Sequence, residues 1–303
     1  MKLDAVATGS ARGGPIPLLL AMRPRQWLKN LLVFIPMLAG HVVNQSTLLH
    51  ALAAFAAFCL CASSAYLLND ALDAGHDRLH KTKRHRPMAA GTLSLGAGRA
   101  ASALLAIAAL AAAAQQGAAF FIVLCGYFVS TLLYSFFIKR LLGLDVIALA
   151  ALYVLRIVGG GDATGVAPSP WLLGFAFFLF LGLALLKRHS ELADLGPSAR
   201  ERIPGRGYGR RHTGLVGAMG LAASCATVAM FALYVVSRSA ALIYPHHGRL
   251  WFAVPLLLAW LGRLWILSYR RRIHEDPLFF VSKDSISLAV IAACIGIVIA
   301  AAH

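Results

Sequence analysis

Long apolar stretches alternate with short polar or basic ones along almost the whole chain. A helix that spans a membrane needs about 20 mostly apolar residues, with a range of about 17–25. Nine stretches meet or approach this length: 26–42, 47–69, 95–115, 117–138, 144–160, 170–187, 213–237, 250–269 and 284–302. The first and the fifth are the weakest, because they are short or carry a charge. The pattern predicts an all-α integral membrane protein with nine transmembrane helices.

The spacing of these stretches predicts a single membrane domain. We expect residues 1–22 to form a cytoplasmic N-terminal segment and residues 23–303 to form the domain, with long cytoplasmic loops at about 70–94 and 188–212. The apolar run at 17–22 is too short for a signal peptide, so we expect none. Long loops among short ones tend to carry function. Chemistry is therefore expected at the end of the bundle that bears these two loops.

Composition and charge narrow the class of protein. Of the 303 residues, 59% are hydrophobic and 13% are charged, whereas an ordinary soluble domain is about 25% charged. The 28 Lys and Arg residues outnumber 12 Asp and Glu residues, and 25 of the 28 fall in the N-terminal segment and in alternate loops. The positive-inside rule then predicts a bacterial-type cytoplasmic membrane, with the N-terminus and the chemistry inside and the C-terminus outside. This one-sided distribution favours a membrane setting over a nucleic-acid partner.

A run of carboxylates ends the second predicted helix, at Asp70, Asp73 and Asp77, with Asn69 before it. At 100° per residue, Asp70 and Asp77 point almost the same way, and Asp73 lies about 60° away. Like charges near a helix C-terminus destabilise the helix, so the pattern favours a bound cation. Ligand sets made only of oxygen select magnesium, manganese or calcium over zinc. The alternative is a solvated helix end that nearby Lys and Arg residues neutralise.

Basic and polar side chains gather at the same predicted side. Lys83 and Arg84 follow the carboxylates directly, and such a run alone is typical of an anchor for anionic lipid. Beside the carboxylates, it favours a diphosphate held between magnesium and the cations. The other candidates for binding phosphorylated substrates are Lys29, Asn30, Tyr134, Lys139, Lys187, Arg188 and Glu191. Membrane anchoring or charge-paired helix ends are the alternatives for these positions, and Arg156, inside the fifth helix, has no assigned role.

The motif Asn-Asp-x-x-Asp-x-x-x-Asp at 69–77, together with the nine predicted helices, resembles the UbiA superfamily of intramembrane prenyltransferases. The resemblance implies a nine-helix UbiA-type bundle that depends on magnesium, with manganese as an alternative. It also implies that Asp70, Asp73 and Asp77 are metal ligands and that Asn69 belongs with them in the catalytic site.

Further segments, at 23–30, 83–91, 134–139 and 187–191, look like the decaprenyl-phosphate phosphoribosyltransferase branch, and Asp276-Pro277 is similar too. This implies transfer of 5-phosphoribose from 5-phosphoribosyl diphosphate to a polyprenyl phosphate, with release of diphosphate. Aromatic prenyltransferases of the superfamily usually carry a second Asp-x-x-x-Asp motif after helix six, where this chain has Lys187, Arg188, Glu191 and Asp194. The alternative is a UbiA-type enzyme that moves a prenyl group from a prenyl diphosphate to an aromatic or other acceptor. A transporter is disfavoured, because the sequence shows no convincing internal repeat.

Overall fold

The computed structural model describes residues 15–79, 83–195, 203 and 205–303, and these ranges are helical without a β-strand. The α-helices are α1 (Pro15–Met22), α2 (Ile35–Ala39), α3 (Gln45–Arg78), α4 (Leu95–Gln115), α5 (Ala118–Phe136), α6 (Leu144–Thr164), α7 (Pro170–Ala193), α8 (Thr213–Val236), α9 (Arg238–Ile243), α10 (Ala253–Tyr269), α11 (Pro277–Lys283) and α12 (Ser285–Ala302). The 3-10 helices are η1 (Pro24–Phe34), η2 (Lys83–His85), η3 (Ile138–Arg140), η4 (Arg210–His212) and η5 (His247–Phe252). Most of the predicted N-terminal segment and part of the predicted loop 188–212 lie outside the described residues.

Eight helical segments of the described chain are long and apolar enough to cross a membrane, so the expected count of nine is not confirmed. The segment that differs is the first, expected at 26–42. Here the chain forms the 3-10 helix η1 and then the five-residue helix α2. Pro36 lacks the N–H group that a continuous α-helix would use, and polar residues crowd the start of the segment. Except for this segment, the all-helical membrane architecture is confirmed.

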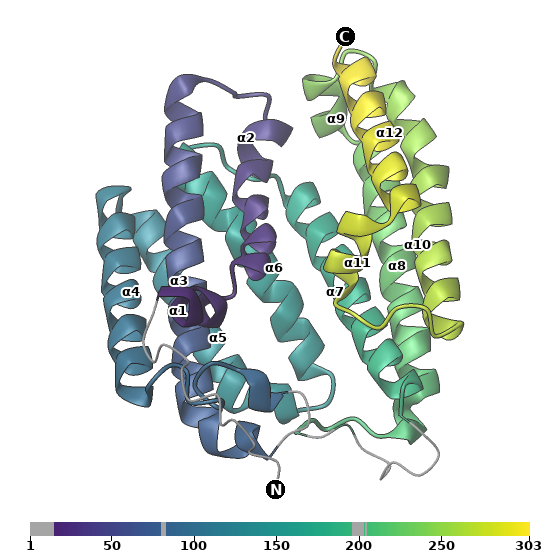
Figure 1. The fold of residues 1–303 in the computed structure, drawn as a ribbon. Helices are drawn as coiled ribbons and strands as arrows, with labels where there is room; N and C mark the ends of the chain where they lie inside the picture. Colours follow the sequence, from purple (N-terminus) through teal and green to yellow (C-terminus); the bar gives the residue numbers. More distant parts are fainter. Residues whose placement is uncertain (1–14, 80–82, 196–202, 204) are drawn as a thin grey trace, which may run out of the picture.

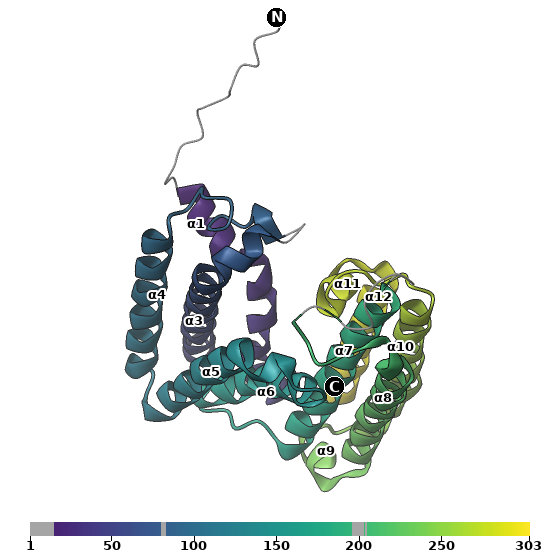
Figure 2. The ribbon, with the colours of Figure 1, turned by 90° about the horizontal axis from the view of Figure 1, so that it is seen from below.

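The helices form two groups that meet along α6 and α7 (Figures 1 and 2). α3, α4, α5 and α6 make the first group, and α7, α8, α10 and α12 make the second. Both α3 and α7 run down to the lower end of the bundle in Figure 1, where α8 begins. The C-terminal ends of α3 and α7 are the two places where the sequence puts its charged motifs. The fold thus brings these motifs to one end of the molecule.

Polar side chains fix where several helices begin. The side chains of Asn44, Ser94 and Ser169 accept hydrogen bonds from backbone N–H groups at the starts of α3, α4 and α7. Such caps satisfy donors that the first turn of a helix leaves without partners. Asp276 and Asp284 cap α11 and α12 in the same way. The carboxylate of Asp276 also binds two lysines, Lys29 and Lys187.

Close backbone contact and buried hydrogen bonds hold η1 and α7 in place. A Cβ atom at Gly160 of α6 would lie 2.0 Å from the Val33 carbonyl oxygen, so only glycine lets η1 approach this closely. On the other side of the bundle, Ser268 of α10 contacts His189 Nδ1 at 2.8 Å and Ser190 Oγ at 2.9 Å. Hydrogen bonds between helices are a common way to join them where lipid surrounds the protein. The two elements that carry Lys29 and Lys187 are therefore rigidly seated.

Candidate active site

The carboxylates at the end of α3 are held by two arginines from other segments. Asp70 and Asp77 are buried, and Arg86 Nη1 lies 3.1 Å from Asp70 Oδ1 and 2.7 Å from Asp77 Oδ2. Arg23 adds a contact of 2.6 Å to Asp70 Oδ1, and its guanidinium lies 4.8 Å from the centre of the Tyr66 ring. One guanidinium can touch both carboxylates because the two lie on one face of the helix, seven residues apart.

Arg23 has an unusual backbone that directs it toward this site. Its φ is 55° and its ψ is 61°, which is the left-handed region that few residues other than glycine adopt. Strain of this kind costs on the order of 1–3 kcal/mol, persists only where the surrounding structure fixes the backbone, and is concentrated at functional sites. The conformation joins the end of α1 to the start of η1 while its side chain reaches Asp70.

Asp73 faces a different partner from those of Asp70 and Asp77. It lies near Lys139 of η3, and its charge favours the protonated form of that lysine. Burial is the largest influence and lowers the pKa of Lys139, and nearby Lys83, Arg140 and Arg206 lower it further. Lys139 thus lies among charges from the α3 end and from the loop before α8. Arg84 points elsewhere: it is exposed, and its Nε lies 3.3 Å from His85 Nε2.

The donor set at the α3 end suits magnesium, although the described residues do not form a converged metal cluster of three or more His, Cys, Asp or Glu side chains. Arg86 lies between Asp70 and Asp77 and neutralises them. Asn69 supplies a second observation: its Oδ1 is buried and has no hydrogen-bond partner in the described chain. A buried acceptor of this kind costs free energy unless a donor or a cation satisfies it. Carboxylate and amide oxygens together are ligands that magnesium accepts.

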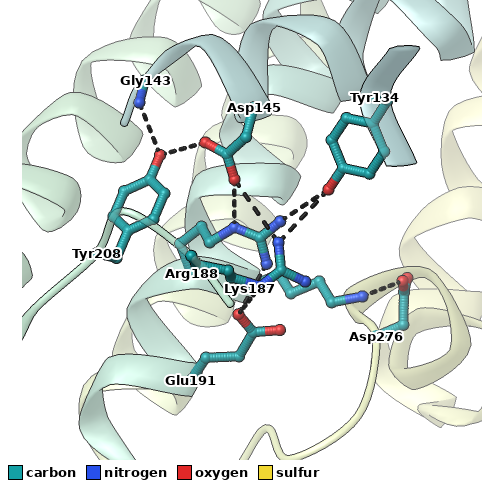
Figure 3. Close-up of polar contacts among 9 residues, drawn as sticks. Tyr134, Gly143, Asp145, Lys187, Arg188, Glu191, Tyr208 and Asp276 are labelled. Carbon is teal, nitrogen blue, oxygen red and sulfur yellow. Dashed lines mark hydrogen bonds and ion pairs between the residues drawn. The ribbon is translucent and has the colours of Figure 1, made fainter. Parts of the chain in front are cut away.

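Arg188 is at the centre of a buried cluster at the end of α7 (Figure 3). Its side chain is 1% exposed and contacts Asp145 Oδ2 and Glu191 Oε2, each at 2.7 Å, and Tyr134 OH at 3.2 Å. Asp145, in the first turn of α6, is fully buried here. Two carboxylates and a phenol therefore occupy the guanidinium, and these contacts favour a structural role for a residue that the sequence suggests as a substrate ligand.

The chain before α8 completes this cluster (Figure 3). Tyr208 donates a hydrogen bond to Asp145 and accepts one from the Gly143 N–H at 3.1 Å. Burial and the bond to Asp145 both raise the pKa of Tyr208. Arg206, two residues earlier, lies 3.8 Å from Asp145 Oδ2 and 3.7 Å from Glu191 Oε2. This segment thus brings a partly exposed guanidinium next to the buried one.

Lys29 and Lys187 share one carboxylate. The Nζ atoms of Lys29 and Lys187 lie 3.1 Å and 2.9 Å from the same Asp276 Oδ2. Lys29 also lies 5.7 Å from the centre of the Tyr153 ring and 5.8 Å from that of Phe279. Burial would raise the pKa of Asp276, but the two lysines outweigh it and lower the pKa from 3.8 to about 2. We call these three residues the lysine–aspartate trio.

Asn30, next to Lys29, is fully buried, and its side chain makes hydrogen bonds inside the protein. Its Oδ1 accepts a hydrogen bond of 2.8 Å from Arg156 Nε, and its Nδ2 lies 3.2 Å from Cys59 Sγ. Arg156 also donates to Tyr127 OH at 2.7 Å and to a carbonyl oxygen of α6. Arg156 therefore does not reach toward the membrane surface, as an arginine near a helix end often does. It links η1 to α5 and α6 and helps to hold Lys29.

The structure thus places in the site five residues that the sequence does not single out as ligands: Arg23, Arg86, Asp145, Arg206 and Asp276. Of these, Arg23, Arg86 and Asp276 lie in the segments that carry the resemblance to the phosphoribosyltransferase branch. The sequence does indicate a role for Arg86 beside the carboxylates, because this residue belongs to the same basic run as Lys83 and Arg84. Arg206 and Asp276 lie far along the chain from their partners, so no local spacing marks them.

Together, these features define an α-helical membrane protein that gathers carboxylates and cations at one end of its bundle, a setting suited to phosphorylated substrates. The sequence model of the UbiA prenyltransferase family matches residues 31–300, and the chain belongs to this family.

Relatives and a solved structure agree with this membership. The protein y4nM of Sinorhizobium fredii is 36% identical over 88% of this chain, which spans about half (52%) of that relative. The nodulation protein NoeC of Azorhizobium caulinodans is 30% identical over 89% of this chain and 88% of its own length. Decaprenyl-phosphate phosphoribosyltransferase of Corynebacterium glutamicum is 40% identical over 57% of this chain and 53% of its own. A UbiA homolog from Archaeoglobus fulgidus, bound to GPP and Mg²⁺, has a TM-score of 0.69 over 93% of this chain and 99% of its own, at 20% identity, which shows the shared fold.

Proposed function

We propose that this UbiA-family protein transfers 5-phosphoribose from 5-phosphoribosyl diphosphate to the phosphate of a polyprenyl phosphate and releases diphosphate. The observation that carries the proposal is the charge at the end of α7. Lys187 stands where a second acidic motif would begin, and together with Lys29 it shares a single carboxylate. Ammonium groups bind a phosphate directly, whereas paired carboxylates need a metal to do so. The similarity to decaprenyl-phosphate phosphoribosyltransferase of Corynebacterium glutamicum supports the same choice.

The α3 end would bind the diphosphate of the donor. Asp70, Asp73, Asp77 and Asn69 would hold magnesium, or manganese in its place. When bound, the metal would neutralise the leaving diphosphate as its charge grows. Arg23 and Arg86, which now neutralise the carboxylates, lie where they could turn to the diphosphate oxygens. Lys139 and Lys83 would add positive charge around the same group, whereas Arg84 points away from it.

The α7 end would bind the acceptor. A phosphate oxygen of the polyprenyl phosphate would attack C1 of the ribose and form the new C–O bond. The bond between C1 and the diphosphate oxygen would break, and diphosphate would leave with the electron pair. The attacking phosphate is already an anion, so the step requires no general base. Lys29 and Lys187 would hold this phosphate, and Glu191, which is 30% exposed, would accept hydrogen bonds from ribose hydroxyls.

We also propose that this end of the bundle faces the cytoplasm of a bacterial cell. The distribution of Lys and Arg supports this orientation, because 25 of 28 fall on the side that carries the two charged motifs. The N-terminus would then be inside and the C-terminus outside. Reporter fusions after residues 79 and 303 should give opposite orientations, and equal signals would contradict this topology.

The decisive assay incubates detergent-purified protein with magnesium, labelled 5-phosphoribosyl diphosphate and a polyprenyl phosphate. We expect magnesium-dependent label in the organic phase and none after addition of EDTA. An Asp70→Asn variant should lose this activity, and an Asp162→Asn variant, changed at the far end of α6, should keep it. If the lipid stays unlabelled while a labelled prenyl diphosphate is consumed with an aromatic acceptor, the protein is a prenyltransferase and the proposal is wrong.

A further inference from the structure

Asp276 is fixed by its own helix before it meets any lysine. It caps α11, where Pro277 is the first residue, and its Oδ1 accepts a hydrogen bond of 3.2 Å from the Leu278 N–H. Its other oxygen, Oδ2, accepts from both Lys187 and Lys29. One carboxylate therefore fixes the start of α11 and ties together two other helices, η1 and α7.

The partners come from distant parts of the chain. Asp276 follows Lys187 by 89 residues and Lys29 by 247. Because both Nζ atoms contact the same oxygen, at 2.9 Å and 3.1 Å, the two ammonium groups lie within about 6 Å of each other. Like charges at this separation repel, so the carboxylate is what makes the arrangement stable.

The lysine–aspartate trio keeps an unbalanced positive charge. Two ammonium groups face one carboxylate, and each ammonium has three N–H donors. Asp276 takes one from each, and Tyr153 takes a second from Lys29. The side chain of Lys187 is 31% exposed, whereas those of Lys29 and Asp276 are each 14% exposed. Donors therefore remain for an anion that approaches from the side of Lys187.

We propose that Asp276 is a positioning residue that holds Lys29 and Lys187 as a paired ammonium site for a phosphate monoester. A monoester carries close to two negative charges at neutral pH and presents three oxygens, which can bridge two ammonium groups. Two sources share this chemistry: the phosphate of the acceptor lipid and the 5-phosphate of the donor sugar. That the phosphate belongs to the acceptor lipid or to the donor sugar rests on the proposed function. The phosphate site itself is inferred from the contacts of the lysine–aspartate trio alone.

Asp276 acts as a tether in this proposal and not as a competitor for the lysines. A competing carboxylate would have to move away when the anion binds. Asp276 is held by the start of α11, so the ligand would join the trio without displacing it. The two roles make opposite predictions, because removing a tether weakens binding and removing a competitor strengthens it.

The direct test is titration of the detergent-purified 303-residue chain with farnesyl monophosphate, and separately with ribose 5-phosphate, in EDTA. We expect wild type to bind at least one of them without metal. Asp276→Asn should weaken that binding by about tenfold or more, because it removes a charge-assisted contact from each lysine. Asparagine is an equally good helix cap, so α11 should remain folded. Asp276→Glu should restore part of the affinity.

Glu275 provides a matched control. It is the residue before Asp276, and its carboxylate holds Lys283 at 2.9 Å and 3.0 Å, but both side chains are exposed. Glu275→Gln should leave binding of both probes unchanged. Lys187→Gln should weaken binding as much as Asp276→Asn.

Transfer assays then identify the source of the phosphate. The Asp276→Asn variant should show a raised KM for one substrate, the polyprenyl phosphate or 5-phosphoribosyl diphosphate, with kcat nearly unchanged. Binding of both probes to Asp276→Asn that equals or exceeds that of wild type would overturn the proposal, and so would a wild type that binds neither. If wild type transfers no phosphoribose, the proposed function fails, and the titration still decides the phosphate site.

Discussion

The C-terminal ends of α3 and α7 meet at one end of the bundle but have opposite electrostatic designs. At the α3 end, carboxylates form the centre, and Arg23 and Arg86 surround them. At the α7 end, cations form the centre, and Asp145 and Asp276 surround them. The first arrangement suits an anion that arrives with a divalent cation, and the second suits an anion that binds directly.

The α7 end also separates two tasks between neighbouring residues. Arg188 is buried and saturated by carboxylates, whereas Lys187 is partly exposed and shares its carboxylate with Lys29. Of these two neighbouring cations, Arg188 stabilises the protein interior and Lys187 is available to bind a ligand. Charge alone does not assign the role; burial and the number of occupied donors do.

Loss of Arg188 should have the largest effect on stability. Arg188→Gln leaves Asp145 buried without its main cation, and breaking a buried pair in this way costs about 3–5 kcal/mol. We expect a strongly lowered Tm in detergent or loss of folded protein. Arg206→Gln is the matched control: Arg206 is 24% exposed and lies 3.8 Å from Asp145, so its loss should cost much less. An Arg188→Gln protein with normal Tm and a raised KM would make Arg188 a substrate ligand.

Loss of a carboxylate at the α3 end should act on turnover. Asp70→Asn should reduce kcat by about 100-fold or more, because stabilisation of the leaving group is lost. Its Tm should change less than that of Arg188→Gln, since Arg86 keeps its bond to Asp77 and Arg23, which loses its carboxylate, is 28% exposed and can be solvated. Steady-state rates at saturating magnesium measure this directly. A rate within threefold of wild type would remove Asp70 from the metal site.

A methyl group at Gly160 should disturb the segment that carries Lys29. In Gly160→Ala the new carbon would meet the Val33 carbonyl oxygen at 2.0 Å, so η1 must shift. Overpacking of this kind costs about 1–3 kcal/mol. We expect a lowered Tm together with weaker binding of farnesyl monophosphate. Gly126→Ala on α5, where a Cβ atom would meet nothing within 4 Å, is the control; equal behaviour of the two variants would contradict the packing of η1 on α6.

Acid should weaken the lysine–aspartate trio only at low pH. The pKa of Asp276 falls from 3.8 to about 2. A depressed carboxylate pKa stabilises the folded state above pH 3.8, and this contribution disappears as the pH falls toward 2. Wild type should therefore lose more Tm than Asp276→Asn between pH 5 and about pH 3, and the two should run parallel above pH 5. Parallel curves throughout would show that the trio does not stabilise the fold.

The smallest effect is expected at the exposed pair of Glu275 and Lys283. Surface ion pairs contribute about 0–1 kcal/mol. Lys283→Gln should leave Tm within about a degree and KM for both substrates unchanged. A larger loss would mean that α11 depends on this pair, and the Glu275→Gln control would have to be replaced.

Local periodicity was sufficient to predict most of the fold. The stretches expected at 95–115 and 284–302 coincide with α4 and α12 to within a residue, because long apolar runs in a membrane leave only the helix to satisfy the backbone. The prediction of the first span failed because Pro36, in the first turn of α2, has no N–H to join α2 to a preceding α-helix, and because Gly160 lets the 3-10 helix η1 pack closely on α6. That contact joins residues more than 120 positions apart, so no window of sequence contains it.

The candidate site, like the fold, could be predicted from local sequence only in part. A fixed helical period suffices to place Asp70 and Asp77 on one face, where Arg86 touches both. Nothing local indicates that Asp276 meets Lys29, or that Arg156 turns inward to Asn30. These partners are selected by helix packing, and the energy of a buried charge depends on which neighbours that packing supplies.

The most direct measurement is equilibrium binding of inorganic diphosphate, farnesyl monophosphate and ribose 5-phosphate to wild type, each with magnesium and with EDTA. We expect diphosphate binding to need the metal and to be lost in EDTA, while at least one of the two monophosphates binds equally well in both. Asp70→Asn should remove diphosphate binding and spare that monophosphate. Loss of all three ligands in EDTA would contradict the contrast between the two helix ends, because the α7 end would then depend on a metal as the α3 end does.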